Sequence, residues 1–288
     1  MITPEQWRAG GTTFRFRGLD IFTRVDGDGE PLLVVHGFPT ASWDYAPIWD
    51  RLTATYRAIT LDMIGFGFSA KPKDFTYSIK TQADLYEAVL AKEGVTKYRL
   101  LAHDYGVSVA QELLARQPEG ATARITAVVL LNGGLFPEAH RPRRVQTLLA
   151  SRLGPIIARL SSYGQFARNM RDIWGKTPPA EAEIKAMWQL VTYNDGMAVM
   201  PKLIGYLAER KAERERWVGA LVNAQVPVRL INGLRDPVAG ASIVARYREL
   251  VPSPDIVELP DAGHYPQVET PDAVANATLD FFARAHKR

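Results

Sequence analysis

Cysteine is absent from the 288-residue sequence, so the chain can form no disulfide, no thiolate metal site and no cysteine nucleophile. It also lacks an uninterrupted apolar run of about 18 residues, the minimum for a membrane-spanning helix. The first residues do not combine a basic stretch with a following apolar stretch. We therefore expect no membrane span, no signal peptide and a cytoplasmic location.

A strong charge of one sign is also absent. The 35 basic and 31 acidic residues leave a net charge of only +4. One compact basic patch consists of His140, Arg141, Arg143 and Arg144. No motif that reads nucleic acid accompanies this patch, so we expect no nucleic-acid partner.

Short β-rich runs alternate with helical patterns over the first 133 residues. The expected strands are Phe14–Arg17, Ile21–Val25, Leu32–Val35, Tyr56–Leu61, Tyr98–Ala102 and Ile125–Leu131. Helical stretches between them include Ile79–Lys92 and Val107–Arg116. Strands that alternate with helices predict parallel pairing through right-handed crossovers.

The pattern changes after Gly134. Helical segments without a convincing strand extend from about residue 135 to residue 223. The strand pattern resumes at Val226–Asn232 and Asp255–Leu259, and a final helix is expected at Pro271–Ala285. We therefore predict one α/β core, residues 1–134 and 224–288, interrupted by a helical cap over residues 135–223.

A turn between a strand and a helix carries the first candidate for catalysis. Ala102, Asp104 and Gly106 occupy the small–x–acid–x–Gly pattern of a nucleophile elbow, in which bulky neighbours would collide with the backbone. Asp104 stands where such elbows usually carry serine. Taken alone, the same residue could instead cap the following helix.

An aspartate at this position has a chemical consequence. A serine that attacked an sp³ carbon would form an ether, which resists hydrolysis. A carboxylate that attacks the same carbon forms an ester, which water can cleave. Asp104 therefore indicates epoxide or alkyl halide substrates rather than ordinary esters.

The acid and the base of a triad should follow the nucleophile in that order along the chain. Asp236 lies in the loop after the strand Val226–Asn232, and His264 lies after the strand Asp255–Leu259. Both therefore have the expected context. Each has a structural alternative: Asp236 could form a turn before Pro237, and His264 could be an ordinary loop histidine.

The turn after the strand Leu32–Val35 could supply an oxyanion hole. Its sequence begins His36-Gly37-Phe38, and the glycine lets backbone amides face the site. We expect the N–H groups of Phe38 and Tyr105 to stabilise an oxyanion. A plain β-turn is the alternative. No dinucleotide fingerprint is present, and we expect neither a metal nor an organic cofactor.

Together these segments resemble the α/β-hydrolase superfamily, in particular its epoxide hydrolase and haloalkane dehalogenase branch. The chain looks still more similar to the mesoderm-specific transcript proteins and their bacterial relatives. The similar stretches are His36–Ser42, Leu61–Pro72, His103–Leu114, Asn132–Pro142, Arg216–Leu221 and His264–Glu269. The resemblance implies a mostly parallel eight-stranded sheet with helices on both faces and an inserted helical cap.

Three positions separate the two branches. Dehalogenases that the chain resembles usually carry tryptophan where this chain has Tyr105, and often asparagine where it has Phe38, to hold the halide. Some place the triad acid where this chain has Asn132. The resemblance therefore favours an epoxide hydrolase, with a haloalkane or haloacid dehalogenase as the alternative.

Epoxide hydrolases of this kind use two cap tyrosines to bind the epoxide oxygen. The resemblance implies Tyr206 as one of them and Tyr163 as the other, with Tyr193 as the alternative to Tyr163. It also implies a small apolar epoxide and water as substrates, contacted by His36, Phe38, Tyr105 and Tyr193.

Two further alternatives stay open: a catalytically silent binding protein on the same scaffold, and an ester or lactone hydrolase in which Asp104 is only a base. Whether the chain is a monomer or a homodimer is also open.

Overall fold

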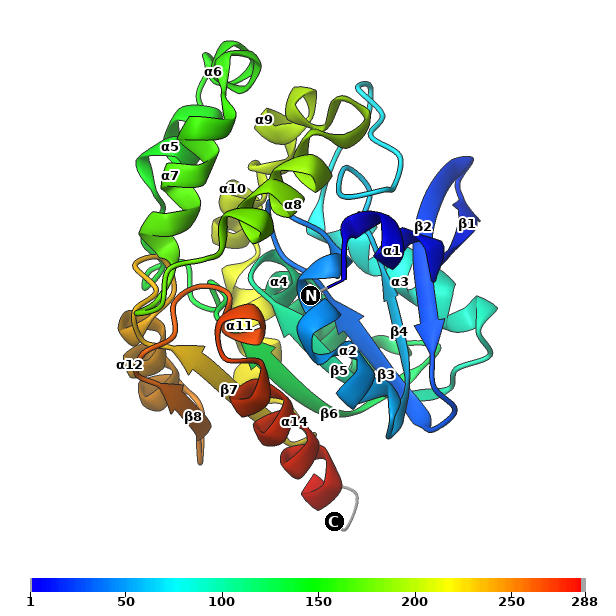
Figure 1. Cartoon of the computed structure of the whole chain (residues 1–288). Coiled ribbons are helices and arrows are strands. Elements are labelled where there is room, and N and C mark those ends of the chain that lie inside the picture. Colours follow the sequence, from blue (N-terminus) through cyan, green and yellow to red (C-terminus); the bar gives the residue numbers. More distant parts are fainter. Residues whose placement is uncertain (1, 286–288) are drawn as a thin grey trace.

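The structure is a computed structural model and describes residues 2–285. Eight strands form one sheet in the order β1-β2-β4-β3-β5-β6-β7-β8 (Figure 1). Their bounds are β1 Thr12–Phe16, β2 Leu19–Asp26, β3 Glu30–Val35, β4 Tyr56–Leu61, β5 Lys97–His103, β6 Arg124–Leu131, β7 Val228–Gly233 and β8 Asp255–Leu259.

Strands β1 and β2 form an antiparallel hairpin at one edge, and β2 pairs antiparallel with β4. All pairs from β4 to β8 are parallel. The predicted mostly parallel eight-stranded sheet is confirmed. Strand β7 begins two residues later than expected, after Pro227, which has no N–H to donate to a ladder.

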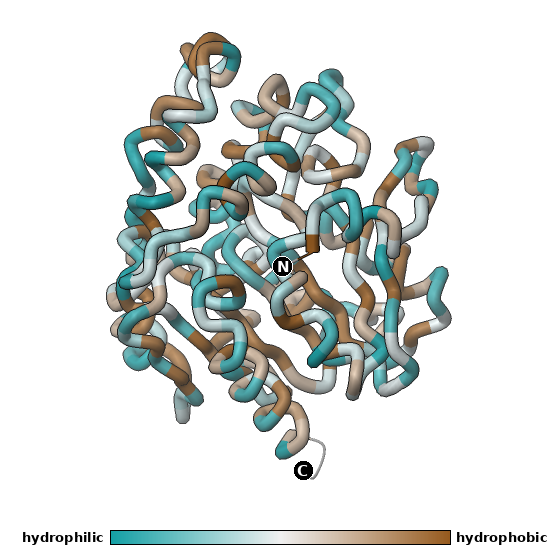
Figure 2. Tube along the Cα trace, viewed as in Figure 1, coloured by the Kyte–Doolittle hydropathy of each residue, from teal (hydrophilic) through white to brown (hydrophobic). Residues whose placement is uncertain are grey.

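Helices cover both faces of the sheet, because its central strands are apolar on both sides. On β3, Leu33 and Val35 pack into one core and Leu32 and Val34 into the other. The first core is covered by α3 (Ile79–Lys92), α4 (Tyr105–Arg116), α11 (Arg214–Val222) and α12 (Ala241–Leu250), and the second by α1 (Pro4–Ala9), α2 (Ala46–Thr53) and α14 (Pro271–Ala285). Figure 2 shows the hydrophobic residues along these central strands.

The chain between β6 and β7 is helical, and most of it lies beyond the carboxyl ends of the parallel strands (Figure 1). Its helices before α11 are α5 Arg144–Leu149, α6 Gly154–Leu160, α7 Tyr163–Ile173, α8 Glu181–Thr192, α9 Met200–Leu203 and α10 Tyr206–Ala212, with a 3₁₀ turn at Tyr193–Ala198. Within residues 2–285, no helix has the length and apolar character that crossing a membrane requires.

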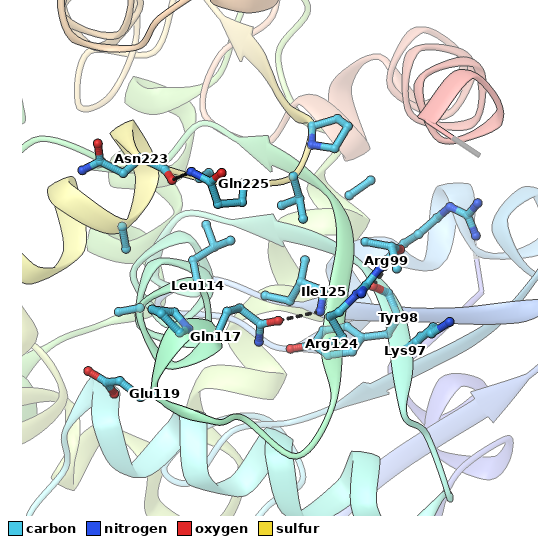
Figure 3. Close-up of a pocket in the computed structure, with 18 of the residues that line it drawn as sticks. Lys97, Tyr98, Arg99, Leu114, Gln117, Glu119, Arg124, Ile125, Asn223 and Gln225 are labelled. Carbon is cyan, nitrogen blue, oxygen red and sulfur yellow. Dashed lines mark hydrogen bonds between the residues drawn. The ribbon is translucent and has the colours of Figure 1, made fainter. Parts of the chain in front are cut away.

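A groove lies at the opposite end of the sheet, where β5 and β6 begin (Figure 3). Its volume is about 1490 Å³, and Lys97, Arg124 and Gln117 are among the residues that line it. Asp104, Asp236 and His264 all follow the carboxyl ends of strands and do not line this groove. The groove is therefore separate from the candidate chemistry.

A buried carboxylate ties α11 to the core helix α4. Glu112 accepts hydrogen bonds from Trp217 Nε1 at 2.7 Å, Arg216 Nε at 2.8 Å and Arg116 Nε at 2.9 Å. Burial favours a higher pKa for Glu112, but these three donors outweigh it and hold the pKa below its usual value. The side chain is 2% exposed, so it has little access to water as a substitute partner.

We expect Glu112→Ala to lower the free energy of unfolding by about 2–4 kcal/mol, because it leaves two arginines and an indole N–H without their shared acceptor. Urea denaturation followed by circular dichroism measures the loss. The matched control is Glu215→Ala in the same region. The Glu215 side chain is 94% exposed, and its loss should change stability by less than about 0.5 kcal/mol. Equal effects of the two substitutions would contradict this account.

Candidate active site

Asp104 forms a sharp corner between β5 and α4. Its φ is 49° and its ψ is −112°, a backbone conformation that side chains other than glycine rarely adopt. The corner is tight: a Cβ at Gly106 would lie 2.5 Å from the carbonyl oxygen of His36. Asp104 occupies the N-cap position of α4, but its carboxylate makes no capping hydrogen bond. Capping therefore does not account for this aspartate.

The two carboxylate oxygens of Asp104 have different partners. Oδ1 accepts a hydrogen bond from the N–H of Phe38 at 2.9 Å, whereas Oδ2 lies 3.4 Å from Nε2 of His264. The Tyr105 N–H lies in the first turn of α4, where backbone N–H groups have no acceptor within the helix. Burial tends to raise the pKa of Asp104, but His264, His103 and the Phe38 amide together hold it below its usual range.

His264 connects Asp104 to a second carboxylate. Its Nδ1 lies 2.8 Å from Oδ2 of Asp236, a distance that fixes the orientation of the ring. Asp236 also accepts hydrogen bonds from the Val238 N–H at 2.7 Å and from Nδ2 of Asn132 at 3.0 Å. Asp104, His264 and Asp236 therefore form a continuous buried chain of polar groups, called the Asp–His–Asp chain below.

Asn132 has a structural role that sequence reasoning missed. It follows β6, and its side-chain oxygen accepts the Gly233 N–H at 2.6 Å while its amide donates to Asp236. It thus joins the ends of β6 and β7 and aims the acid. Its place at a strand end was visible in the sequence, but the pairing of the two strands that brings it to Asp236 was not.

The two carboxylates determine the charge of the histidine. Burial alone would lower the pKa of His264, but Asp236 and Asp104 outweigh it and raise this pKa well above its usual value. Burial likewise tends to raise the pKa of Asp236, whereas His264 and the N–H donors lower it. The two carboxylates therefore favour the protonated form of His264 in the resting site.

Tyr206 is the cap residue that reaches this site. Its ring centroid lies 4.8 Å from that of Tyr105 and 6.2 Å from that of Phe38. The residue is 3% exposed, and within residues 2–285 its hydroxyl proton has no acceptor, since the polar side chain beside it is the Arg210 guanidinium, a donor. A buried hydroxyl that lacks an acceptor destabilises the folded protein, so the Tyr206 hydroxyl is a candidate to donate a hydrogen bond to a ligand atom.

Two further buried groups near the Asp–His–Asp chain were not recognised in the sequence. Arg210 follows Tyr206 one helical turn later, with its guanidinium carbon 5.8 Å from the Tyr206 ring centroid. It donates to the carbonyl oxygen of Gly134 and forms no ion pair with any described carboxylate. His140 has a buried Nε2 without a partner in the described chain. Burial, reinforced by Arg210, lowers the pKa of His140 to about 3, so the ring is neutral.

The structure does not bring Tyr163 or Tyr193 to Asp104. The Tyr163 hydroxyl, at the start of α7, donates to the carboxylate of Glu181 on the exposed side of the cap. The Tyr193 ring packs edge-on against Phe68 at 5.1 Å instead. The resemblance assigned the cap tyrosines by their position along the chain, which does not determine which way a helix turns its side chains.

His36 also differs from the expectation of a substrate contact. Its Nε2 accepts the Met63 N–H at 3.0 Å, so Nδ1 carries the proton and donates to the carbonyl oxygen of Gly37 at 2.9 Å. Burial lowers the pKa of His36 and favours this neutral form. His36 therefore shapes the turn that presents the Phe38 amide.

This sheet order, with an acid at the corner between β5 and α4, defines an α/β hydrolase. Residues 32–277 match the Alpha/beta hydrolase family, and the chain belongs to it. It is 41% identical to the mesoderm-specific transcript homolog protein of Bos taurus, over 96% of this chain and 87% of that protein. It is also 41% identical to LipZ of Mycobacterium tuberculosis (strain ATCC 25618 / H37Rv), over 97% of this chain and 98% of that protein.

Solved structures agree on the fold. The haloalkane dehalogenase DbeA from Bradyrhizobium elkani USDA94 has a TM-score of 0.79 and 20% identity, covering 96% of this chain and 98% of that chain. The epoxide hydrolase CorEH has a TM-score of 0.78 and 18% identity, covering 95% of this chain and 98% of that chain. At these identities the likeness extends to the fold and not to the substrate.

The Asp–His–Asp chain predicts the titration of His264. In a protein labelled at its histidine carbons, NMR should find His264 protonated well above the usual pKa of about 6.5. Asp236→Asn should lower that pKa, because it removes the negative charge nearest to Nδ1. Asp255→Asn is the control, since that carboxylate pairs with Arg229 on β7. An unchanged His264 titration in Asp236→Asn would contradict the assignment.

Proposed function

We propose that this hydrolase converts epoxides to vicinal diols through a covalent ester of Asp104. The observation that carries the proposal is the asymmetry of the Asp104 carboxylate. The Phe38 amide holds Oδ1, while Oδ2 lies beside His264 without a backbone donor. One oxygen is thus available for attack, and the other is already in position as the carbonyl oxygen of an ester.

In the first step, Oδ2 of Asp104 attacks an epoxide carbon and the ring C–O bond breaks. The epoxide oxygen leaves as an alkoxide and takes a proton from the Tyr206 hydroxyl, which has no other acceptor for that proton within the described residues. Burial and the Asp104 charge raise the pKa of Tyr206, whereas Arg210 lowers it. Arg210 therefore assists through Tyr206 by stabilising negative charge on the phenol oxygen.

In the second step, water cleaves the ester. Alkylation removes the charge of Asp104, so one of the two carboxylates that raise the His264 pKa is lost. His264 can then pass its proton through solvent to the Tyr206 phenolate, which restores the hydroxyl, and its free Nε2 accepts a proton from the attacking water. The hydroxide attacks Cγ of Asp104, and Oδ1 carries the negative charge at the Phe38 and Tyr105 amides. The Cγ–Oδ2 bond then breaks, the departing diol oxygen takes the proton held by His264, and the new carboxylic acid of Asp104 returns a proton to His264 and becomes the carboxylate again.

The covalent route fixes the source of each oxygen. In a single turnover of styrene oxide in ¹⁸O-water, the label should enter the Asp104 carboxylate and not the diol. Mass spectrometry of the peptide that contains Asp104 measures it. Direct attack of water on the epoxide, with Asp104 as a base, would instead place the label in the first diol formed.

His264→Gln should trap the ester, because the base of the second step is lost while the nucleophile remains. The Asp104 peptide should then gain the full mass of the epoxide, and turnover should fall about 10³-fold or more. Asp104→Asn is the control and should show neither adduct nor turnover. An adduct from a bromoalkane with release of bromide, and none from the epoxide, would identify a dehalogenase instead.

Tyr206→Phe tests the assignment of the acid. We expect kcat for styrene oxide to fall about 10²-fold, because the alkoxide loses its proton donor. Formation of the Asp104 adduct should slow equally, whereas its hydrolysis should be unchanged. Tyr163→Phe is the matched control, since that hydroxyl binds Glu181. Equal losses in the two variants would contradict the role given to Tyr206.

A further inference from the structure

Exposed apolar side chains are concentrated at one place on the cap. Five large hydrophobic residues are exposed within residues 2–285, and four of them lie between residues 148 and 160. Their exposed fractions are 50% for Leu148, 58% for Leu153, 57% for Ile156 and 73% for Leu160. Helix α6 stands at the outer tip of the cap (Figure 1), where Figure 2 shows hydrophobic residues. A gathering of this kind marks an interaction surface.

The spacing gathers these side chains on one face of α6. Leu153, Ile156 and Leu160 stand at positions i, i+3 and i+7, which share one side of a helix. The opposite side carries Gly154 and Ala158, which are buried. The exposed Leu153–Ile156–Leu160 stripe thus lies away from the protein interior.

Arginines flank this apolar stripe. Arg152 and Arg159, seven residues apart, form an exposed stripe beside it and make no ion pair within the described chain. Between residues 141 and 168 the sequence has six arginines and no acidic residue. Because this segment carries +6 and the whole chain +4, the remainder of the chain carries −2. The basic excess of the protein is therefore confined to the cap.

We propose that the α5–α6 face, defined by Leu148, Leu153, Ile156, Leu160, Arg152 and Arg159, docks on an anionic lipid surface. Leucine and isoleucine beside arginine match both components of such a surface, acyl chains and negative headgroups. A nucleic acid would offer phosphates but no apolar layer. A second copy would meet this face with the same arginines, because a two-fold contact pairs a patch with itself.

The docking is peripheral and independent of the reaction at Asp104. Helices α5 and α6 have 6 and 7 residues, too short to span a bilayer. The face can bury its leucine and isoleucine side chains only to the depth of the headgroup boundary. Binding to anionic vesicles should therefore be reversible and should weaken as salt screens the arginines.

Co-sedimentation of the full chain with vesicles tests the proposal. We expect binding to phosphatidylcholine vesicles that contain phosphatidylserine, and at least tenfold weaker binding to phosphatidylcholine alone. The double variant Ile156→Glu/Leu160→Glu should reduce binding at least tenfold. Ile2→Glu is the matched control, because Ile2 is the remaining exposed large hydrophobic residue, at 39%. It should bind like the wild type.

A second pair of variants distinguishes the effect of the α5–α6 face on vesicle binding from the effect of net charge. Arg152→Glu/Arg159→Glu and Lys97→Glu/Arg124→Glu change the net charge equally, but Lys97 and Arg124 line the groove at the opposite end of the sheet (Figure 3). Only the first pair should lose vesicle binding. All variants should keep the thermal midpoint and the turnover of a soluble substrate, which shows that they are folded.

Three results would overturn the proposal. The first is no binding of the wild type to anionic vesicles. The second is an equal loss in both charge variants, which would mean that net charge alone drives binding. The third is a concentration-dependent dimer that Ile156→Glu/Leu160→Glu abolishes, with vesicle binding unaffected, which would assign the face to a second copy of the chain.

Discussion

The hydrogen bond from the Phe38 amide to Oδ1 of Asp104 depends on two backbones that approach very closely. A Cβ at Gly37 would lie 2.7 Å from Cβ of Asp104, and a Cβ at Gly106 would lie 2.5 Å from the His36 carbonyl oxygen. Glycine at both positions lets the end of β3 meet the start of α4. The positive φ of Asp104 persists because this packing holds the corner from both sides.

The other polar groups of the site follow from that corner. Once Asp104 is fixed at the end of β5, the parallel neighbours β6, β7 and β8 end at the same edge of the sheet. Asn132, Asp236 and His264 each follow one of those strands, so the Asp–His–Asp chain crosses the sheet edge. The sheet thus places these polar and charged groups next to one another, and burial strengthens the electrostatic interactions between them.

The core could be predicted from the sequence because its signals are local. Continuous apolar runs identify buried parallel strands, and the elbow pattern around Asp104 requires glycine for a steric reason. The cap could not be predicted to the same depth. Tyr206 packs against Tyr105, next to Asp104 in the chain, whereas Tyr163 contacts Glu181, and only the packing of α7 and α10 decides between them. In the sequence Arg210 stands between Glu209 and Lys211, and nothing there indicates that α10 turns it into the interior.

The hydrogen bond from Arg210 to the Gly134 carbonyl oxygen bears on how fast a substrate enters the site. Gly134 immediately precedes the cap segment and α10 lies near its end, so this contact links the two ends of the cap close to Asp104. Asp104 is 6% exposed and Tyr206 3%, so a molecule larger than water reaches Oδ2 only when Tyr206 and the cap around it move aside. Entry of substrate and release of product therefore depend on the same opening of the cap, and the frequency of that opening sets an upper limit on turnover.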